Sequence, residues 1–133
     1  MNFNNLNDIL ECRYCLETQL AFLCASRITD DEIEELRKIL SLQCCYTDYR
    51  KVIYDTQFHK FIAKCSRNNL LFNFYMDIFD TIQDYIIKSI QSKPQDAFND
   101  DIIHISLFEA ISDRKPSLAY EFAGKLSNNI SIK

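Results

Sequence analysis

The chain is poor in the residues that bend a backbone. Among its 133 residues there are one glycine and two prolines. Sheets and β-sandwiches need many turn residues, whereas helical bundles need few. The apolar fraction of 47% and the aromatic fraction of 13% exclude a disordered chain. We therefore expect one all-α domain that spans residues 1–133.

Basic clusters, long apolar runs and a signal peptide are also missing. The net charge is −4, so we expect no direct contact with nucleic acid, because phosphates require a basic face. No apolar run approaches the roughly 18 residues of a membrane span. The N-terminus has no basic region followed by an apolar one. These absences predict a cytoplasmic protein without membrane contact, whose six cysteines are reduced.

The cysteine spacing gives little support for a metal or redox site. Cys12 and Cys15 form one CxxC without a second copy, and they fall in a strongly helical stretch rather than on a zinc-knuckle turn. Cys44 and Cys45 are adjacent, near a predicted helix end. We expect these four residues to be small apolar groups that pack between helices, and a metal or redox role is the less favoured alternative.

Hydrophobic periodicity predicts an antiparallel bundle of six helices. The first covers about residues 6–27, and the second begins with a capping box formed by Thr29 and Glu32. The others cover about 50–67, 69–91, 95–112 and 116–129, with residues 92–95 as the one clear loop. The dipeptide Asn68-Asn69 separates the third helix from the fourth. The fourth is apolar on several sides, so we expect it either at the bundle centre or against a partner chain.

Two polar residues of the third predicted helix lie on its apolar side. The polar stripe of this helix consists of Gln57, Lys60, Lys64 and Arg67. At 100° per residue, Asp55 lies almost opposite that stripe, and His59 lies about 40° from Asp55. A buried carboxylate and a buried imidazole need partners, because uncompensated burial costs several kcal/mol. Asp55 and His59 are therefore candidate site residues.

The second histidine of the chain shows the same anomaly. His104 shares a stripe with Leu107, Phe108 and Ile111 on the fifth predicted helix. Both histidines thus face the core, and an Asp and a His four residues apart can bind one metal from the same helix face. The alternative is an Asp55–His59 ion pair within a buried polar network, with His104 simply packed.

Several short motifs, in this order and spacing, resemble those of a known family. They are Arg13-x-x-Leu16-Glu17, Asp30-Asp31-Glu32-Ile33, Asp55-x-x-Phe58-His59, Ser66-Arg67-Asn68-Asn69-Leu70, the segment from His104 through Ile111, and Ala119 onward. Nearly the whole chain resembles the effector-binding C-terminal domain of GntR-family transcription regulators, the FadR-type or FCD group.

The resemblance implies a metal site at the base of an effector pocket. Many members of the family hold a divalent ion with one Asp and three His, and Asp55, His59 and His104 match three of these ligands. The implied ion is Zn, Ni or Mn. The fourth ligand would stand at Leu126, on an apolar stripe, so we expect an incomplete site.

Residues next to Leu126 are the possible substitutes for the missing ligand. Asn129, one turn later, is the candidate that could reach toward the site. Ser127 and Asn128 are expected to point elsewhere.

The resemblance also implies a function. It implies a homodimeric, non-enzymatic domain that senses a small carboxylate metabolite and controls DNA binding by a separate winged helix-turn-helix domain. That DNA-binding domain is expected to be absent from this chain, since the first family helix begins within a few residues of Met1. Arg13 is a candidate partner for the effector carboxylate, and the alternative is a solvated arginine.

Two other functions stay open at this stage. One is a structural or interaction bundle whose site is degenerate. The other is a metalloenzyme built on two His and one carboxylate.

Overall fold

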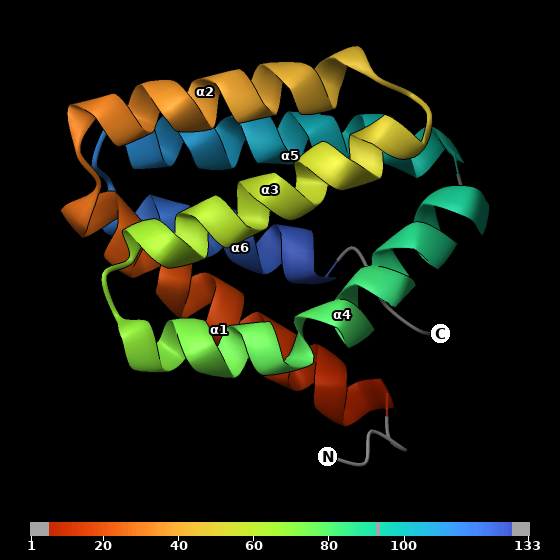
Figure 1. Ribbon diagram of the computed structural model, residues 1–133, viewed down its shortest axis with the longest axis horizontal. Coiled ribbons are helices and arrows are strands. Elements are labelled where there is room, and N and C mark those ends of the chain that lie inside the picture. The colour runs from red at the N-terminus through yellow and green to blue at the C-terminus, as the bar shows by residue number, and fades with distance from the viewer. Residues whose placement is uncertain (1–5, 93, 129–133) are drawn as a thin grey trace.

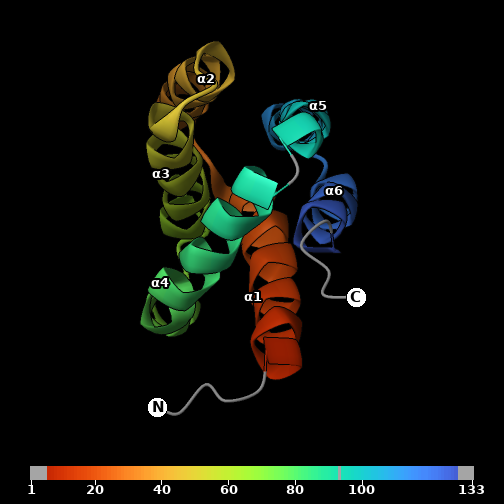
Figure 2. The same ribbon diagram turned by 90° about the vertical axis from the view of Figure 1, so that its right-hand side faces the viewer.

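The helices are arranged around a central first helix. The computed structural model describes residues 6–92 and 94–128, without the side chains of residues 6, 82 and 85–99. The helices are α1 (Leu6–Arg27), α2 (Asp30–Cys45), α3 (Tyr49–Cys65), α4 (Asn69–Ser92), α5 (Pro94–Ser112) and α6 (Pro116–Asn128) (Figure 1). Seen end-on, α2, α3 and α4 lie on one side and α5 and α6 on the other (Figure 2). α1 contacts α3, α4, α5 and α6, and the all-α bundle predicted from the sequence is confirmed.

Two predicted helix starts are confirmed by their capping contacts. The Thr29 hydroxyl accepts a hydrogen bond from the Glu32 amide at 3.2 Å, and the Glu32 carboxylate accepts one from the Thr29 amide at 3.0 Å. At the start of α4, the Asn68 side chain accepts from the Leu71 amide at 3.0 Å. These contacts satisfy amides that have no partner within their own helix.

Three predicted boundaries differ from the structure. α3 ends at Cys65 rather than Arg67, because Arg67 adopts a left-handed backbone with φ of 55°. The four-residue loop predicted at 92–95 is wrong, since α4 continues to Ser92 and α5 begins at Pro94. The fixed φ of a proline suits the first position of a helix. The predicted end at Asn129 lies outside the described residues.

The apolar helix α4 lies at the side of the bundle rather than at its centre. It contacts α1, α3 and α5 and buries Tyr75, Ile78 and Phe79. On its outer side, Leu70 and Phe74 remain 65% and 52% exposed. A central position for α4 is therefore wrong, and a contact with a partner chain stays a prediction.

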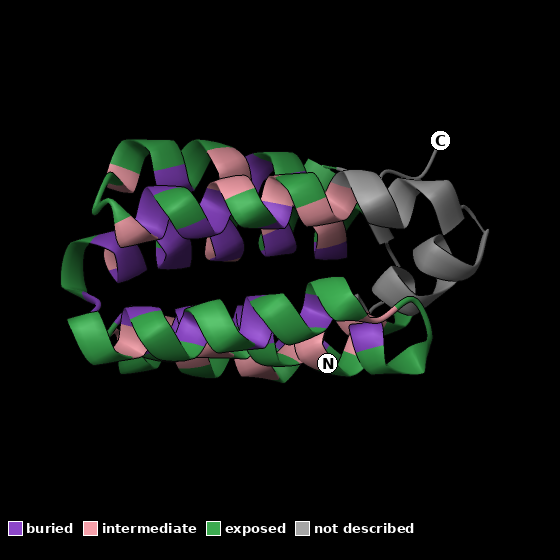
Figure 3. Ribbon diagram, turned by 90° about the horizontal axis from the view of Figure 1, so that it is seen from above, coloured by how far each residue is buried: buried purple, intermediate pink, exposed green. Residues whose placement is uncertain are grey.

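Helix α6 approaches α1 closely at a glycine. A Cβ atom at Gly124 would lie 3.1 Å from Cε2 of Tyr14 and 3.5 Å from Cγ2 of Thr18. The buried residues of the helices face the space between the two sides of the bundle (Figure 3). Within the described ranges, no helix is long and apolar enough to cross a membrane.

The packing role predicted for four cysteines is wrong. Cys12, Cys15, Cys44 and Cys45 are all exposed. Cys12 and Cys15 fall outside the buried stripe of α1 that contains Arg13, Glu17, Leu20 and Cys24. The buried thiols are those of Cys24 and Cys65, and a hydrogen bond between the two thiols, together with burial, raises the pKa of Cys24.

Candidate metal centre

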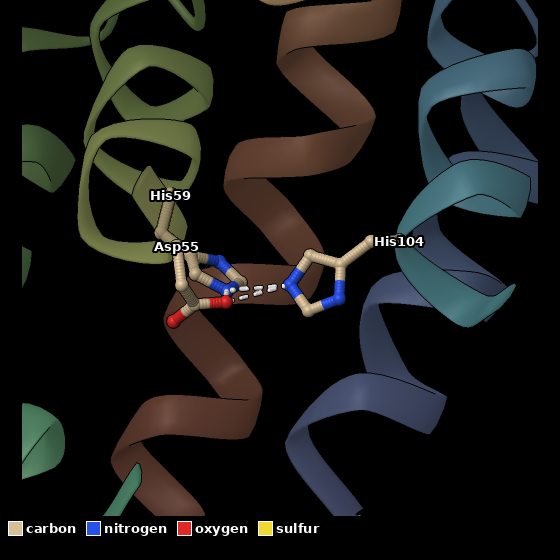
Figure 4. Close-up of side chains that lie close together, drawn as sticks. All are labelled: Asp55, His59 and His104. Carbon is tan, nitrogen blue, oxygen red and sulfur yellow. Dashed lines mark hydrogen bonds and ion pairs between the residues drawn. The ribbon is translucent and has the colours of Figure 1, made fainter. Parts of the chain in front are cut away.

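Helices α3 and α5 bring the three residues singled out by the sequence to one point. Asp55 and His59 stand one turn apart on α3, and His104 reaches them from α5 (Figure 4). His104 Nε2 lies 2.8 Å from Asp55 Oδ1 and 3.4 Å from His59 Nε2. His59 Nε2 lies 3.5 Å from Asp55 Oδ1. All three side chains are buried, and His104 is therefore not simply packed beside an Asp55–His59 pair.

The outer nitrogen of each imidazole faces an acceptor. His104 Nδ1 lies 2.6 Å from the carbonyl oxygen of Asp100, so Nδ1 carries the hydrogen and donates it. His59 Nδ1 faces Glu17 Oε2 at 3.9 Å. In a neutral ring this leaves the Nε2 lone pair directed inward. When both rings are neutral, two imidazole lone pairs and a carboxylate oxygen face one another, an arrangement that either a metal ion between them or a second proton on one ring makes favourable.

The spacing of these atoms suits a divalent metal ion. With metal–ligand bonds of 2.0–2.1 Å, neighbouring ligands of a tetrahedral ion lie about 3.3 Å apart. The measured separations of 2.8, 3.4 and 3.5 Å lie around that value. In addition, ligand histidines in metal sites commonly donate their other N–H to a carbonyl or carboxylate. The donor set, two imidazoles and one carboxylate, therefore fits a divalent transition-metal ion.

The electrostatics favour an ionised Asp55. Burial by itself raises the pKa of Asp55, but the charge of His59 and the hydrogen bonds from His104 and His59 outweigh it and hold the pKa well below its usual range. Burial lowers the pKa of His59, and the carboxylates of Asp55 and Glu17 reverse this, so that the pKa of His59 is raised. The two carboxylates that favour a proton on His59 would also favour a bound cation.

Glu17 of α1 supports the cluster from the side opposite Asp55. Its Oε1 accepts hydrogen bonds from Arg13 Nε and from the Ser127 hydroxyl, both at 3.0 Å. Its Oε2 accepts a short hydrogen bond from the Tyr75 hydroxyl. Burial raises the pKa of Glu17, but Arg13, His59, Tyr75 and Ser127 together lower it below the usual value. The Glu17 carboxylate thereby connects α1 to α3, α4 and α6.

Arg13 lies inside the bundle rather than in solvent. Its side chain is paired with Glu17 on the same helix, and the residue is 2% exposed. The alternative of a solvated arginine is therefore wrong. The Nη1 atom of Arg13 is buried and has no hydrogen-bond partner among the described residues. A guanidinium nitrogen in this state can donate to a ligand that enters the bundle.

Leu126, where the family resemblance implies a fourth ligand, lines the same cavity as His59. Together with Glu17, Leu20, Tyr75 and Leu107 it lines a small cavity of about 10 Å³, roughly the room of one water molecule. The prediction that Ser127 points elsewhere is wrong, since this residue is buried and donates to Glu17. Asn128 is exposed, and Asn129 lies outside the described residues.

Sequence reasoning missed the residues that surround the three ligands. They are Glu17, Gln43, Tyr75, Ser127 and the ion pair of Lys51 with Asp101. Of these, Gln43 contacts a candidate ligand directly, because its Nε2 donates to Asp55 Oδ1 at 3.2 Å. A signal existed for Glu17, which is three residues before Leu20 and seven before Cys24 on the apolar stripe of α1.

Comparison with known proteins identifies the family of the chain. The FCD domain family model matches residues 8–126. The solved structure of Streptococcus agalactiae GntR is similar with a TM-score of 0.79 and 25% sequence identity, and the match covers 92% of this chain. The chain spans 56% of that protein's length. No curated protein has significant sequence similarity to the chain. Because the family match covers nearly the whole bundle, including all three residues of the cluster, the chain belongs to the FCD domain family.

Proposed function

We propose that the chain is the ligand-sensing domain of a GntR-type transcription regulator and binds a small carboxylate over a divalent metal ion. The observation that carries this proposal is the convergence of Asp55 Oδ1, His59 Nε2 and His104 Nε2 within 3.5 Å of one another in a buried place. The FCD family match and the likeness to a GntR structure support a regulatory, non-enzymatic role.

Different residues of the site would bind the metal and the effector. Asp55, His59 and His104 would hold the ion, and Zn, Ni and Mn are the candidates that suit two imidazoles and one carboxylate. A bound divalent ion supplies open coordination positions for a carboxylate oxygen. Arg13 offers a buried guanidinium nitrogen with no partner in the described part of the chain, which can bind the same carboxylate. The aliphatic side chains of Leu20, Leu107 and Leu126 form the apolar part of the small cavity beside His59.

In a regulator, the domain would transmit effector binding to a DNA-binding domain. A carboxylate that favours one conformation of the bundle would change the placement of a DNA-binding domain elsewhere in the assembly. We propose that the regulator works in the cytoplasm and that this chain forms a homodimer. The exposed Leu70 and Phe74, one turn apart on α4, support a subunit contact.

Sedimentation velocity should give a dimer for the wild type and a monomer for Phe74→Lys, and a monomeric wild type would remove the dimer from the proposal.

Metal content and effector binding test the proposal together. We expect the purified chain to take up about one equivalent of Zn²⁺, Ni²⁺ or Mn²⁺ per chain in elemental analysis after dialysis. The metal-loaded protein should then gain thermal stability with at least one compound from a panel of small mono- and dicarboxylates, because a ligand that binds only the folded state stabilises it. Absence of metal uptake, combined with no stabilisation by any carboxylate, would favour a structural bundle with a degenerate site.

Leu126 provides a gain-of-function variant. Leu126→His should raise the affinity for Zn²⁺, because the added imidazole enters the cavity that His59 lines and supplies a fourth protein ligand. We expect a gain of about tenfold or more, the scale on which an outer partner of a metal ligand already affects metal affinity. Competition with a chromophoric chelator measures it. Asn128→His, on the exposed neighbouring position of α6, is the matched control. Equal affinities in the wild type and Leu126→His would contradict the placement of the site.

A further inference from the structure

Gln43 of α2 is a buried amide whose side-chain oxygen has no hydrogen-bond partner among the described residues. The residue is 1% exposed. Its Nε2 donates to Asp55 Oδ1 at 3.2 Å, which is the carboxylate oxygen that also faces both imidazoles. Its Oε1 is buried without a hydrogen-bond partner among the residues that the structure describes. Because unpaired buried acceptors destabilise a fold, such an atom is suited to accept a hydrogen bond from a bound water or ligand.

The orientation of this amide is determined by Asp55. If the amide were turned over, Oε1 would face Asp55 Oδ1, and two acceptors would oppose each other. The donor therefore points to Asp55, and the acceptor is left beside the cluster, on the same amide carbon. A hydrocarbon side chain of similar size would fill the same volume without an unpaired acceptor.

Lys51 and Asp101 hold the backbone of Gln43 in place. Lys51 Nζ donates to the Gln43 carbonyl at 3.1 Å and to both carboxylate oxygens of Asp101, at 2.6 and 2.7 Å. The last turn of α2 contains no basic residue, so Lys51 supplies the positive charge that a helix C-terminus favours. Lys51 stands one turn before Asp55 on α3, and Asp101 stands three residues before His104 on α5. This contact thus fixes α2 against the two helices that carry the cluster.

We propose that Gln43 is a positioning residue of the metal centre: its Nε2 orients Asp55, and its Oε1 would accept a hydrogen bond from an O–H group bound beside Asp55, either a water or the hydroxyl of an effector. This inference rests on the proposed metal site. It assigns Gln43, a residue that the family motifs in this sequence do not include, to the recognition of an O–H donor beside Asp55.

Measuring Co²⁺ binding distinguishes a positioning role of Gln43 from a packing role. In Gln43→Met the side chain keeps its length but loses both polar atoms. We expect its Co²⁺ affinity to fall by about 10- to 100-fold, the range typical for loss of an outer partner of a metal ligand. We also expect the visible absorption bands of bound Co²⁺ to change, because the ligand geometry at Asp55 and the bound water change. Leu36→Met, a substitution of similar volume at another fully buried position of α2, should alter neither property. Gln43→Asn, which keeps the amide but shortens it, should behave like Gln43→Met and covers the case in which the methionine variant does not fold.

Unchanged Co²⁺ affinity and an unchanged spectrum in a folded Gln43 variant would overturn the inference. If the wild type itself binds no Co²⁺, Zn²⁺, Ni²⁺ or Mn²⁺, the proposed metal function fails. Gln43 is then judged in the metal-free protein by the ring nitrogen chemical shifts of His59 and His104. Shifts that change in Gln43→Met and not in Leu36→Met support its positioning of Asp55, and identical spectra reject it.

Discussion

Glu17→Gln should destabilise the fold by about 3–5 kcal/mol, the usual cost of removing one partner from a buried ion pair. The substitution preserves the volume of the side chain but removes the charge that Arg13 faces at 3.0 Å inside the bundle. It also weakens the acceptor for Tyr75 and Ser127, so the lost contacts extend to α4 and α6. For a chain of this size, the midpoint of thermal unfolding should fall by roughly 10–20 °C.

The matched control for Glu17 is an exposed pair with the same helical spacing. Glu121 and Lys125 stand four residues apart on α6, with an N–O distance of 3.7 Å and both side chains more than half exposed. Glu121→Gln should change the free energy of unfolding by less than about 1 kcal/mol, since exposed pairs contribute little. Urea unfolding followed by circular dichroism measures both variants. A Glu17→Gln protein as stable as Glu121→Gln would mean that Arg13 is not buried against a charged Glu17.

His104→Ala should abolish stoichiometric metal binding. It removes the ligand that α5 contributes, 2.8 Å from Asp55 Oδ1, and leaves only one imidazole and one carboxylate on α3. We expect the affinity for Zn²⁺ to fall by more than the factor of about 100 that accompanies loss of an outer partner. Elemental analysis after dialysis and chelator competition are the two measurements.

Phe108→Leu is the control for packing damage on the same helix. Phe108 lies one turn after His104 on the buried stripe of α5, and the substitution reduces side-chain volume without removing a metal donor. It should therefore lower stability and leave metal content unchanged. If His104→Ala retained as much metal as the wild type, the ion would be bound elsewhere and the assignment of all three ligands would have to be abandoned.

The elements of this fold are largely predictable because local chemistry determines them. The capping box at Thr29, the break at Asn68 and the apolar stripes are set by residues three or four positions apart. The same periodicity placed Asp55, His59 and His104 on buried faces, and the structure buries all three. Where local signals failed, as at Arg67 and at Pro94, one backbone conformation or one favourable first-turn residue moved the helix end.

The surroundings of the cluster were not predictable in the same way. Glu17 meets Tyr75 and Ser127 across 58 and 110 residues of sequence, and Lys51 meets Asp101 across 50. Periodicity shows which face of a helix is buried, but it does not show which buried faces meet. Ser127 illustrates this: its angular distance from Leu126 suggested a different direction, yet α6 packs so closely on α1 that its hydroxyl still reaches Glu17.

The three candidate ligands exist as a set only in the folded chain. Asp55 and His104 are 49 positions apart in the sequence, on two different helices, so an unfolded chain presents no such site. A ligand bound there adds to folding stability by mass action, about 2.7 kcal/mol at a free concentration 100 times its Kd. The supply of the proposed ligand would then affect resistance to proteases and lifetime in the cell, so the abundance of the protein as well as its conformation would depend on that ligand.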